Sequence, residues 1–478
     1  MFLIDKQPKE KLQLISKIKQ FYVKLKQELC FSEEMKNIFL QSFVILLFVF
    51  LSIFWKWFSV VALISTLIAI IVNLNGKNLY FVFLLLPFVS IFKININDFY
   101  LLPIVVAMII LILGIKLLIN LFKKQEKLNI PLTIMMGLFL VYLIIGLKFS
   151  NITTFLSLTL GLALLYVIYY FRKDISLKEL AFVFGLGILA SIVIGLFRPI
   201  NSRLQLMVAQ FSALGLNRFS ACAENVNVFA GELAILLSAF ACLFMKKQIN
   251  ISFYIIYTIT FFVLSFTMSK SALLIFLVLT ASLILYTIIN EKKKCYKDIL
   301  IIISCLLIVF IINPIRTYTF MFRLFENDIT SSNGLTNLTT GRFDIWMVYL
   351  DYIFASFKTI MFGYGISAPN VGAWTSLENC SSHNTIIQMW YHIGIVGIIL
   401  FFCLLCTYIG WKKVFKLNFA TIVIIFAVIM FLMGLDFFSY RFSNYFLFIC
   451  FAYQKKDEEF LNDLKVDSIE NKRRLNDT

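Results

Sequence analysis

Histidine is scarce in this sequence, since only His383 and His392 occur among 478 residues. Cysteine offers no metal site either, because the single C-x-x-C pair, Cys403 and Cys406, lies in an apolar run and no second pair completes it. Zinc sites usually combine several His or Cys ligands. A zinc enzyme is therefore not expected and no cofactor is predicted. His392 and most of the nine scattered cysteines are expected to be packed core residues.

Charged residues are scarce as well. They make up 14% of the chain against 61% hydrophobic residues, and the mean hydropathy is +0.90. Soluble proteins contain about 45–50% apolar residues, so this composition excludes an ordinary soluble protein and predicts an all-α polytopic membrane protein. No cleavable signal peptide is visible. The first apolar run follows about 37 polar or amphipathic residues, and we expect the first spanning helix to direct insertion.

Apolar runs long enough to cross a bilayer recur along the chain, and we expect about 12–14 transmembrane helices of roughly 17–25 residues each. The candidate runs are residues 37–56, 58–74, 78–95, 99–121, 130–149, 151–171, 177–197, 227–245, 250–267, 270–290, 297–315, 386–411, 419–438 and 440–454. Ahead of them, residues 5–29 repeat apolar residues at helical spacing with lysines between. This pattern predicts an amphipathic helix on the cytoplasmic lipid surface, with a soluble helix packed on a loop as the alternative.

The formal net charge of +17 would fit a nucleic-acid partner, but the basic residues occur in short clusters between apolar runs. With the N-terminus placed in the cytoplasm, every close-set basic cluster falls on the cytoplasmic side, as the positive-inside rule requires. We therefore expect a lipid bilayer as partner and no nucleic acid. The predicted division is a cytoplasmic amphipathic segment at 1–37, a polytopic membrane domain at 38–454 with external loops 198–226 and 313–386, and a charged cytoplasmic tail at 455–478.

The first external loop carries Arg198, Arg203 and Arg218. A guanidinium group can form two parallel hydrogen bonds to a phosphate group, and it keeps its charge in proteins. Three such groups just outside a membrane therefore favour binding of a lipid-linked phosphate. Contact with lipid headgroups, or pairing with Glu224 and Glu232, is the alternative. Glu232 lies about one turn into the next run, where an ionisable group faces a partner or water. It is expected to pair with Arg218, with a catalytic role as the alternative.

The remaining candidate site residues lie in the short turn Ser269-Lys270 and in the second external loop. Lys270 is expected to contact a phosphate group, and the alternative is that its side chain extends to the membrane interface. A helix is expected from Asp344 onward, which places Arg342 near its N-terminus, where backbone N–H groups favour anions. His383 stands beside Asn384 at the entrance to the following run. It is a candidate general base because imidazole titrates near neutrality, and a structural role is the alternative.

Several short motifs follow one another in a set order. They are Arg218 followed by N-x-F-A from Asn227, the turn Ser269-Lys270, G-R-x-x-x-W from Gly341 to Trp346, F-G-x-G from Phe362 to Gly365, and His383-Asn384 followed by Gly394 and Gly397. In this order and on one face, they resemble the O-antigen polymerase/O-antigen ligase superfamily of bacterial envelope glycosyltransferases, over residues 150–410. The sequence departs from the family pattern at Lys270, where Arg is usual, and at Glu224-Asn225-Val226, where a Pro often precedes the Asn.

The resemblance implies a GT-C-like helical fold in the cytoplasmic (inner) membrane of a bacterium, with both termini cytoplasmic and the active site on the outer face. It also implies transfer of a glycan from undecaprenyl diphosphate to a hydroxyl acceptor, without metal or nucleotide sugar. Carried over by matched position, Arg218 and Arg342 engage the diphosphate and His383 serves the acceptor. The substrate-binding residues expected around them are Arg198, Arg203, Asn227, Glu232, Lys270 and Asn384.

Our first hypothesis is a polymerase that joins undecaprenyl-diphosphate-linked oligosaccharide repeat units into a surface polysaccharide, either O-antigen or capsule. A chain-length regulator is a further candidate partner. The alternative within the family is a ligase that passes the glycan to lipid A core in lipopolysaccharide biosynthesis. A flippase for the same lipid-linked sugar is disfavoured, because the sequence shows no internal repeat. The two external loops also carry Cys222 and Cys380, which an oxidising compartment would allow to pair.

Overall fold

The computed structural model describes residues 7–55, 57–73, 76–88, 93–94, 99–147, 152–197, 218–223, 225–290, 295–322, 342–366, 368, 371, 382, 384–415, 418–432 and 441–453. Over these residues the chain is helical apart from one short strand pair, so the expected all-α polytopic fold is confirmed. Seven of the described helices are long and apolar enough to span a membrane, or eight if one bent pair is a single span. The expected count of about 12–14 is reached only when the shorter apolar helices of 10–17 residues are included.

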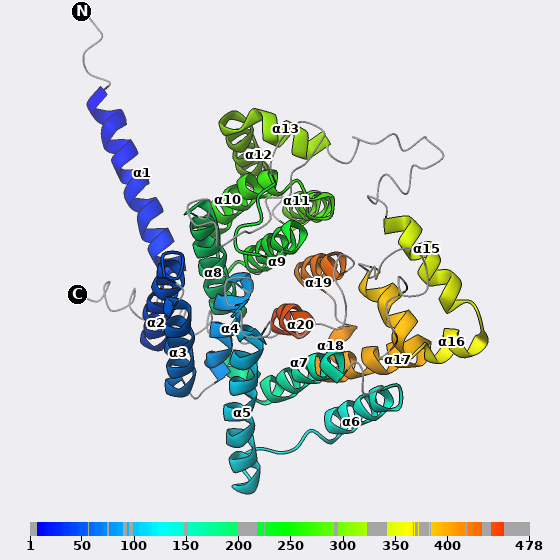
Figure 1. Ribbon diagram of the computed structural model, residues 1–478. Coiled ribbons are helices and arrows are strands. Elements are labelled where there is room, and N and C mark those ends of the chain that lie inside the picture. Colours follow the sequence, from blue (N-terminus) through cyan, green and yellow to red (C-terminus); the bar gives the residue numbers. More distant parts are fainter. Residues whose placement is uncertain are drawn as a thin grey trace, which may run out of the picture.

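The helices form a bundle (Figure 1). The first half comprises α1 (Gln7–Glu28), α2 (Glu33–Leu51), α3 (Trp57–Val72), η1 (Gly76–Leu79), α4 (Tyr80–Leu85), η2 (Leu86–Phe88), β1 (Lys93–Ile94), β2 (Phe99–Tyr100), α5 (Leu101–Phe122), α6 (Ile130–Ile145), α7 (Ile152–Phe171), η4 (Arg172–Asp174) and α8 (Leu177–Phe197). The second half comprises α9 (Val226–Met245), α10 (Ile251–Thr267), α11 (Lys270–Asn290), α12 (Cys295–Ile312), α13 (Pro314–Phe322), α15 (Arg342–Ile353), α16 (Phe357–Phe362), α17 (Thr385–Ile409), α18 (Trp411–Val414), α19 (Phe419–Leu432) and α20 (Arg441–Ala452). The two strands pair antiparallel.

Helix α9 is the centre of the bundle, and almost every one of its residues is buried. It packs against α8, α10, α11 and α19, which surround it in Figure 1. Small residues allow this close approach: a Cβ atom on Gly231 would come within 1.8 Å of the Phe431 ring on α19. Because lipid tails are as apolar as the helices, such tight packing is what favours helix association in a membrane.

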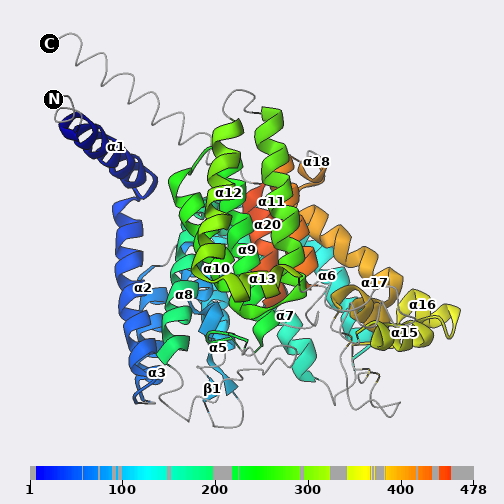
Figure 2. The ribbon, with the colours of Figure 1, turned by 90° about the horizontal axis from the view of Figure 1, so that it is seen from above.

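Basic residues gather at one end of the bundle, which we call the basic end and which includes Arg172, Lys246 and Lys412. Arg172 follows α7 and donates to the Tyr408 carbonyl of α17 at 2.9 Å. Lys246 follows α9 and donates to the Ala452 carbonyl of α20, also at 2.9 Å. Lys412 lies in α18, directly after α17. Figure 2 shows α1 and α18 toward this end and β1, α15 and α16 toward the other, which we call the loop end.

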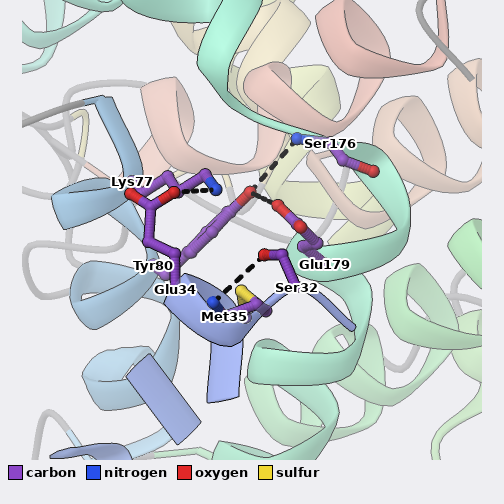
Figure 3. Close-up of polar contacts among 7 residues, drawn as sticks. All are labelled: Ser32, Glu34, Met35, Lys77, Tyr80, Ser176 and Glu179. Atoms are coloured by element: carbon purple, nitrogen blue, oxygen red, sulfur yellow. Dashed lines mark hydrogen bonds and ion pairs between the residues drawn. The ribbon is translucent and has the colours of Figure 1, made fainter. Parts of the chain in front are cut away.

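Polar contacts at the basic end tie the early helices to α8 (Figure 3). Lys77 Nζ lies 2.8 Å from Glu34 Oε2 at the start of α2. The Tyr80 hydroxyl donates to Glu179 at 2.6 Å and accepts the backbone N–H of Ser176 at 3.1 Å. Glu179 lies in the first turn of α8, where the helix dipole favours a carboxylate. These bonds therefore fix η1 and α4 against the start of α8.

The amphipathic helix expected near the N-terminus is present as α1, and Glu28 joins it to the bundle. Glu28 Oε1 accepts the backbone N–H groups of Asn250 at 3.0 Å and Ile251 at 2.9 Å. Glu28 Oε2 accepts both the backbone N–H and the hydroxyl of Ser252 at 2.8 Å. Asn250 occupies the N-cap position of α10 but makes no capping bond with its own side chain. Glu28 thus caps α10 from 222 residues away.

Replacing Glu28 with alanine is expected to loosen the first turn of α10. The loss of a helix cap costs about 0.5–2 kcal/mol, so hydrogen exchange of the Asn250, Ile251 and Ser252 amides should accelerate by about 2- to 30-fold. Hydrogen exchange with mass spectrometry on the purified full-length protein measures this directly. The matched control is Glu33→Ala: its partner Lys36 is exposed, and exposed ion pairs contribute little. Equal exchange in both variants would contradict the capping role.

The span predicted over residues 78–95 is wrong in length. The helical stretch η1–α4–η2 ends at Phe88, and the residues from Leu79 to Phe88 are buried. Leu84 packs so closely on α8 that a Cβ atom on Gly187 would lie 2.4 Å from the Leu84 carbonyl oxygen. An apolar run of this length is typical of a buried core helix rather than a spanning one. The run is apolar because protein surrounds it.

Helix α17 is broken at Gly394, which has φ 63° and ψ −177°. The turn after α16 fits into this break: the N–H groups of Tyr364 and Gly365 donate to the carbonyls of Tyr391 and His392, both at 2.8 Å. Non-helical backbone at membrane depth must find such internal partners. The break therefore fixes the first part of α17 and α16 as one unit.

Glycines allow the backbones to meet at this junction. A Cβ atom would lie 2.3 Å from the Met361 carbonyl oxygen if placed on Gly394, and 2.6 Å from the His392 carbonyl oxygen if placed on Gly363. His392 is 3% exposed, and its Nδ1 lies 3.1 Å from the Gly365 carbonyl oxygen. The expected packed role of His392 is confirmed.

Candidate functional site

Arg218 is held at the loop end against the turn between α10 and α11. Its Nε donates to the Thr267 carbonyl at 2.8 Å, and its Nη2 donates to Asn227 Oδ1 at 3.1 Å. Asn227 lies in the first turn of α9, which Asn225 caps. Helix α11 begins three residues after Thr267, at Lys270. Three predicted substrate-binding or catalytic residues, Arg218, Asn227 and Lys270, are therefore brought to one place.

Glu232 lies deeper in α9 and is 2% exposed. Its Oε1 accepts the hydroxyl of Tyr445 on α20 at 3.0 Å. The Tyr445 ring packs edge-on against Phe431 at 4.8 Å between centroids. This bond joins Glu232 to α20, whereas the bonds of Arg218 given above join it to Thr267 and Asn227. The expected Glu232–Arg218 pair stays a prediction, and the contact with Tyr445 was not expected.

A second group forms around α15. This helix begins at Arg342, two residues before the predicted start. Trp346 Nε1 donates to the Ser382 carbonyl at 2.9 Å, and Tyr349 and Tyr391 pack together in a small separate core. Residues four apart lie on one face of a helix. Arg342 therefore shares a face with Trp346, which contacts the segment that leads into α17.

The guanidinium of Arg342 is half-buried. Burial lowers the pKa of Arg342 from its ordinary value, although arginine remains charged in proteins. Within the described ranges, no hydrogen bond or ion pair of this guanidinium is recorded. A partly desolvated cation of this kind at a helix N-terminus is suited to an anionic ligand.

Asn384 is the N-cap of α17 and is 4% exposed. Its Oδ1 accepts the backbone N–H groups of Ile386 at 3.1 Å and Ile387 at 3.3 Å. The Ser382 hydroxyl donates to the Asn384 carbonyl at 2.9 Å. The next residue, Thr385, donates its hydroxyl to the Leu432 carbonyl at the end of α19. The side chain of Asn384 therefore orders the entrance to α17, and its contact with substrate stays a prediction.

The two groups lie at the same end of the bundle, with α19 between them. Helix α19 packs against α9 and α11 and reaches α17 through Leu432. Figure 1 shows α19 in this intermediate position. An elongated substrate that contacts both groups would therefore pass over the end of α19.

Several predicted residues lie outside the described residues. They are His383, Arg198 and Arg203 among the site residues, and Glu224, Gly341 and Cys380 among the residues that support them. Cys222 is described, and its sulfur lies 3.4 Å from the Ser191 carbonyl oxygen. The roles of the first three and the Cys222–Cys380 pair stay predictions.

Sequence reasoning missed Tyr445, Ser382 and the short helix α13. Tyr445 and Ser382 carry no local signal, because their partners are 213 and 36 residues away. Helix α13 had a signal in Asn313-Pro314, since proline ends a helix and favours the start of another. Its residue Arg316 was not considered.

Residues 253–402 match the family model described as O-antigen ligase. Comparisons with curated proteins and with solved structures gave no match. The matched residues include the Ser269-Lys270 turn, the G-R-x-x-x-W and F-G-x-G motifs, His383-Asn384 and Gly394. Arg218 and Asn227 precede the match. The resemblance to the O-antigen polymerase/ligase superfamily is confirmed over these residues.

Proposed function

We propose that this chain, whose residues 253–402 match the family model described as O-antigen ligase, is a polymerase that joins lipid-linked oligosaccharide repeat units into a surface polysaccharide. The apolar helices fit a multi-pass membrane protein, and the match over residues 253–402 supports a function of the O-antigen ligase or polymerase type, with a glycosyltransferase-like activity. The polymerase activity, the undecaprenyl-diphosphate donor and the bacterial inner membrane are the proposal.

One observation supports this proposal most directly. The Trp346–Ser382 bond brings the helix that begins at Arg342 to the segment that contains His383 and Asn384. A cation for a leaving diphosphate and a base for an attacking hydroxyl are the two groups that this transfer needs. Both belong to the matched part of the chain.

The proposed reaction transfers the glycan in one displacement. The hydroxyl oxygen of the acceptor sugar bonds to the anomeric carbon of the donor, while the bond from that carbon to the diphosphate oxygen breaks. The hydroxyl proton passes to His383, and undecaprenyl diphosphate leaves with the electron pair. Arg342 stabilises the charge on the leaving group, and Arg218 with Lys270 binds the diphosphate. Aligned reactants and a stabilised leaving group account for the acceleration.

The distribution of charge supports the proposed sidedness. Arg172, Lys246 and Lys412 lie at the basic end, and the positive-inside rule assigns this end to the cytoplasm. Arg218, Lys270 and Arg342 then lie at the outer face, where lipid-linked repeat units are proposed to arrive. Helix α1 is at the cytoplasmic end in this arrangement.

Deletion of the gene tests the polymerase against the ligase. A strain without the protein is expected to accumulate glycans of a single repeat unit, because no other step would extend them. Electrophoresis and mass spectrometry of the extracted glycans measure the distribution of chain lengths. A plasmid copy of the chain should restore long polymer. Accumulation of full-length chains on undecaprenyl diphosphate would instead identify the ligase.

A flippase remains the alternative from a different class, and the purified protein separates it. When the protein is in detergent and is supplied with lipid-linked repeat units, there is no gradient across a membrane and no closed compartment into which a substrate could be transported. Extension of the glycan under these conditions requires a transferase. No extension, together with movement of the same lipid across proteoliposome membranes, would support transport instead.

A further inference from the structure

Helix α13 begins where the chain leaves α12 with a bend of 116°. Pro314 opens it, and proline cannot supply the N–H that would continue α12. α13 packs against both α10 and α12, and Figure 1 shows it beside the end of α12. Phe320 is fully buried and its ring lies 6.4 Å from that of Phe261 on α10. These contacts anchor α13 to the part of α10 that approaches the loop end.

Arg316 on α13 is held over an aromatic ring of α10. Its guanidinium carbon lies 4.7 Å from the centroid of the Phe266 ring. The next residue of α10, Thr267, accepts the Nε of Arg218 at 2.8 Å. Two arginines from different elements therefore hold consecutive residues of the last turn of α10, directly before Lys270.

Arg316 is half-buried. Burial lowers the pKa of Arg316 from its ordinary value, which indicates that its charge is partly desolvated. When a guanidinium stacks on an aromatic ring, the flat face of the guanidinium contacts the ring. The N–H donors lie in the plane of the guanidinium and point away from its centre, so the stacking leaves them able to bind an acceptor. The adjacent Thr317 is 1% exposed, and in the described part of the chain its hydroxyl has no hydrogen-bond partner. A buried hydroxyl in that state indicates water or a ligand.

We propose that Arg316 is a third cation of the lipid-diphosphate site, beside Arg218 and Lys270. The inference rests on the proposed function and adds a residue, and a helix, to its donor site. An anion with two phosphate groups has enough oxygen atoms to accept hydrogen bonds from several cations at once. Helix α13 thereby becomes part of the wall of the site.

The shared chemistry is a phosphate group, which could belong to the lipid-linked donor or to an ordinary phospholipid. The position of Arg316 favours the donor. A snorkelling arginine extends away from the protein toward the headgroups, whereas Arg316 lies over the ring of Phe266, next to the residue that holds Arg218.

The experiment measures binding of farnesyl diphosphate and of inorganic diphosphate to the purified full-length protein in phosphatidylcholine nanodiscs. Arg316→Ala is expected to weaken farnesyl diphosphate binding by about 10- to 100-fold, since a hydrogen bond to a charged group is lost. Arg316→Lys should recover part of this affinity. Phe266→Leu, which removes the ring beneath the guanidinium, should weaken binding by about threefold. Size-exclusion profiles and melting temperatures check that each variant is folded.

Arg172→Ala is the matched control. Arg172 also lies over an aromatic ring, 4.1 Å from the Tyr169 centroid, but at the basic end. Its removal is expected to leave diphosphate binding unchanged.

The outcomes separate this inference from the proposed function. If the unmodified protein binds no farnesyl diphosphate, the proposed donor is wrong. If it binds and Arg316→Ala binds equally well, the role of Arg316 is wrong and the proposed function stands. If Arg316→Ala loses only its association with phosphatidylglycerol, measured by lipid mass spectrometry in mixed nanodiscs, Arg316 is a phospholipid contact and the inference is overturned.

Discussion

Replacing Gly394 with alanine is expected to weaken the docking of α15 and α16 on the bundle and to lower the rate of glycan transfer. The φ of 63° and ψ of −177° at Gly394 lie in a region open essentially to glycine, and occupying it costs other residues about 1–3 kcal/mol. The added Cβ would also lie 2.3 Å from the Met361 carbonyl oxygen. The equilibrium constant for docking should therefore fall by at least about tenfold. Hydrogen exchange over residues 342–366, with the rate of polymer formation, measures both effects.

The control for this variant is Gly137→Ala. Gly137 lies in α6, which packs against α17, and no atom lies within 4 Å of the position of its Cβ. Alanine in a helix is favoured over glycine by about 1 kcal/mol, so this variant should be at least as stable as the original protein. Native exchange and normal transfer in Gly394→Ala would show that the docking at the break is unnecessary.

Replacing Arg342 with alanine is expected to lower the rate of transfer by about 100- to 1,000-fold, the usual effect of removing a group that stabilises charge in a transition state. Arg342 is half-buried at the start of α15, and burial lowers its pKa. The remaining structure should be unaffected, because Trp346 and Tyr349 hold α15 in place. Initial rates of glycan extension by purified protein, compared at equal amounts of membrane-inserted protein, give the effect.

Two further variants show whether the loss of transfer rate is specific to the guanidinium of Arg342. Arg342→Lys keeps the charge but not the paired donors, so it should recover only part of the rate. Lys358→Ala removes an exposed cation from α16, in the same unit of the structure, and should leave the rate unchanged. A normal rate for Arg342→Ala would remove this residue from the transfer step. A loss of similar size for Lys358→Ala would show that the general positive charge of this unit is responsible.

The long spanning helices were the most predictable part of the structure. Residues 177–197 and 270–290 were predicted as spans, and α8 and α11 have these same bounds. Each is a long apolar run bounded by a polar or charged segment, and the bilayer fixes its length. The prediction of a span over residues 78–95 was wrong because apolar residues are favoured both next to lipid and in a protein core. Sequence alone could not tell which of the two would surround Leu84 and its neighbours.

For the candidate site, sequence could name the residue types but not their partners. The glycines of F-G-x-G and Gly394 were recognised as parts of one series. Their physical role lies in a contact between segments about thirty residues apart, which spacing does not reveal. The Glu232–Tyr445 bond was even less predictable from the sequence, because its partners are 213 residues apart. Such pairs depend on which helices become neighbours, and that order follows from packing around α9.

The Glu28 contact with α10 has a consequence for biosynthesis. The two sides of this contact are separated by 222 residues, and ribosomes add about 5–20 residues per second. On the order of ten to forty seconds must therefore pass between synthesis of the first helix and synthesis of the amides it will hold. Throughout that interval Glu28 lacks the α10 amides that it binds in the finished protein, so this contact can form only late in synthesis, after α10 has emerged.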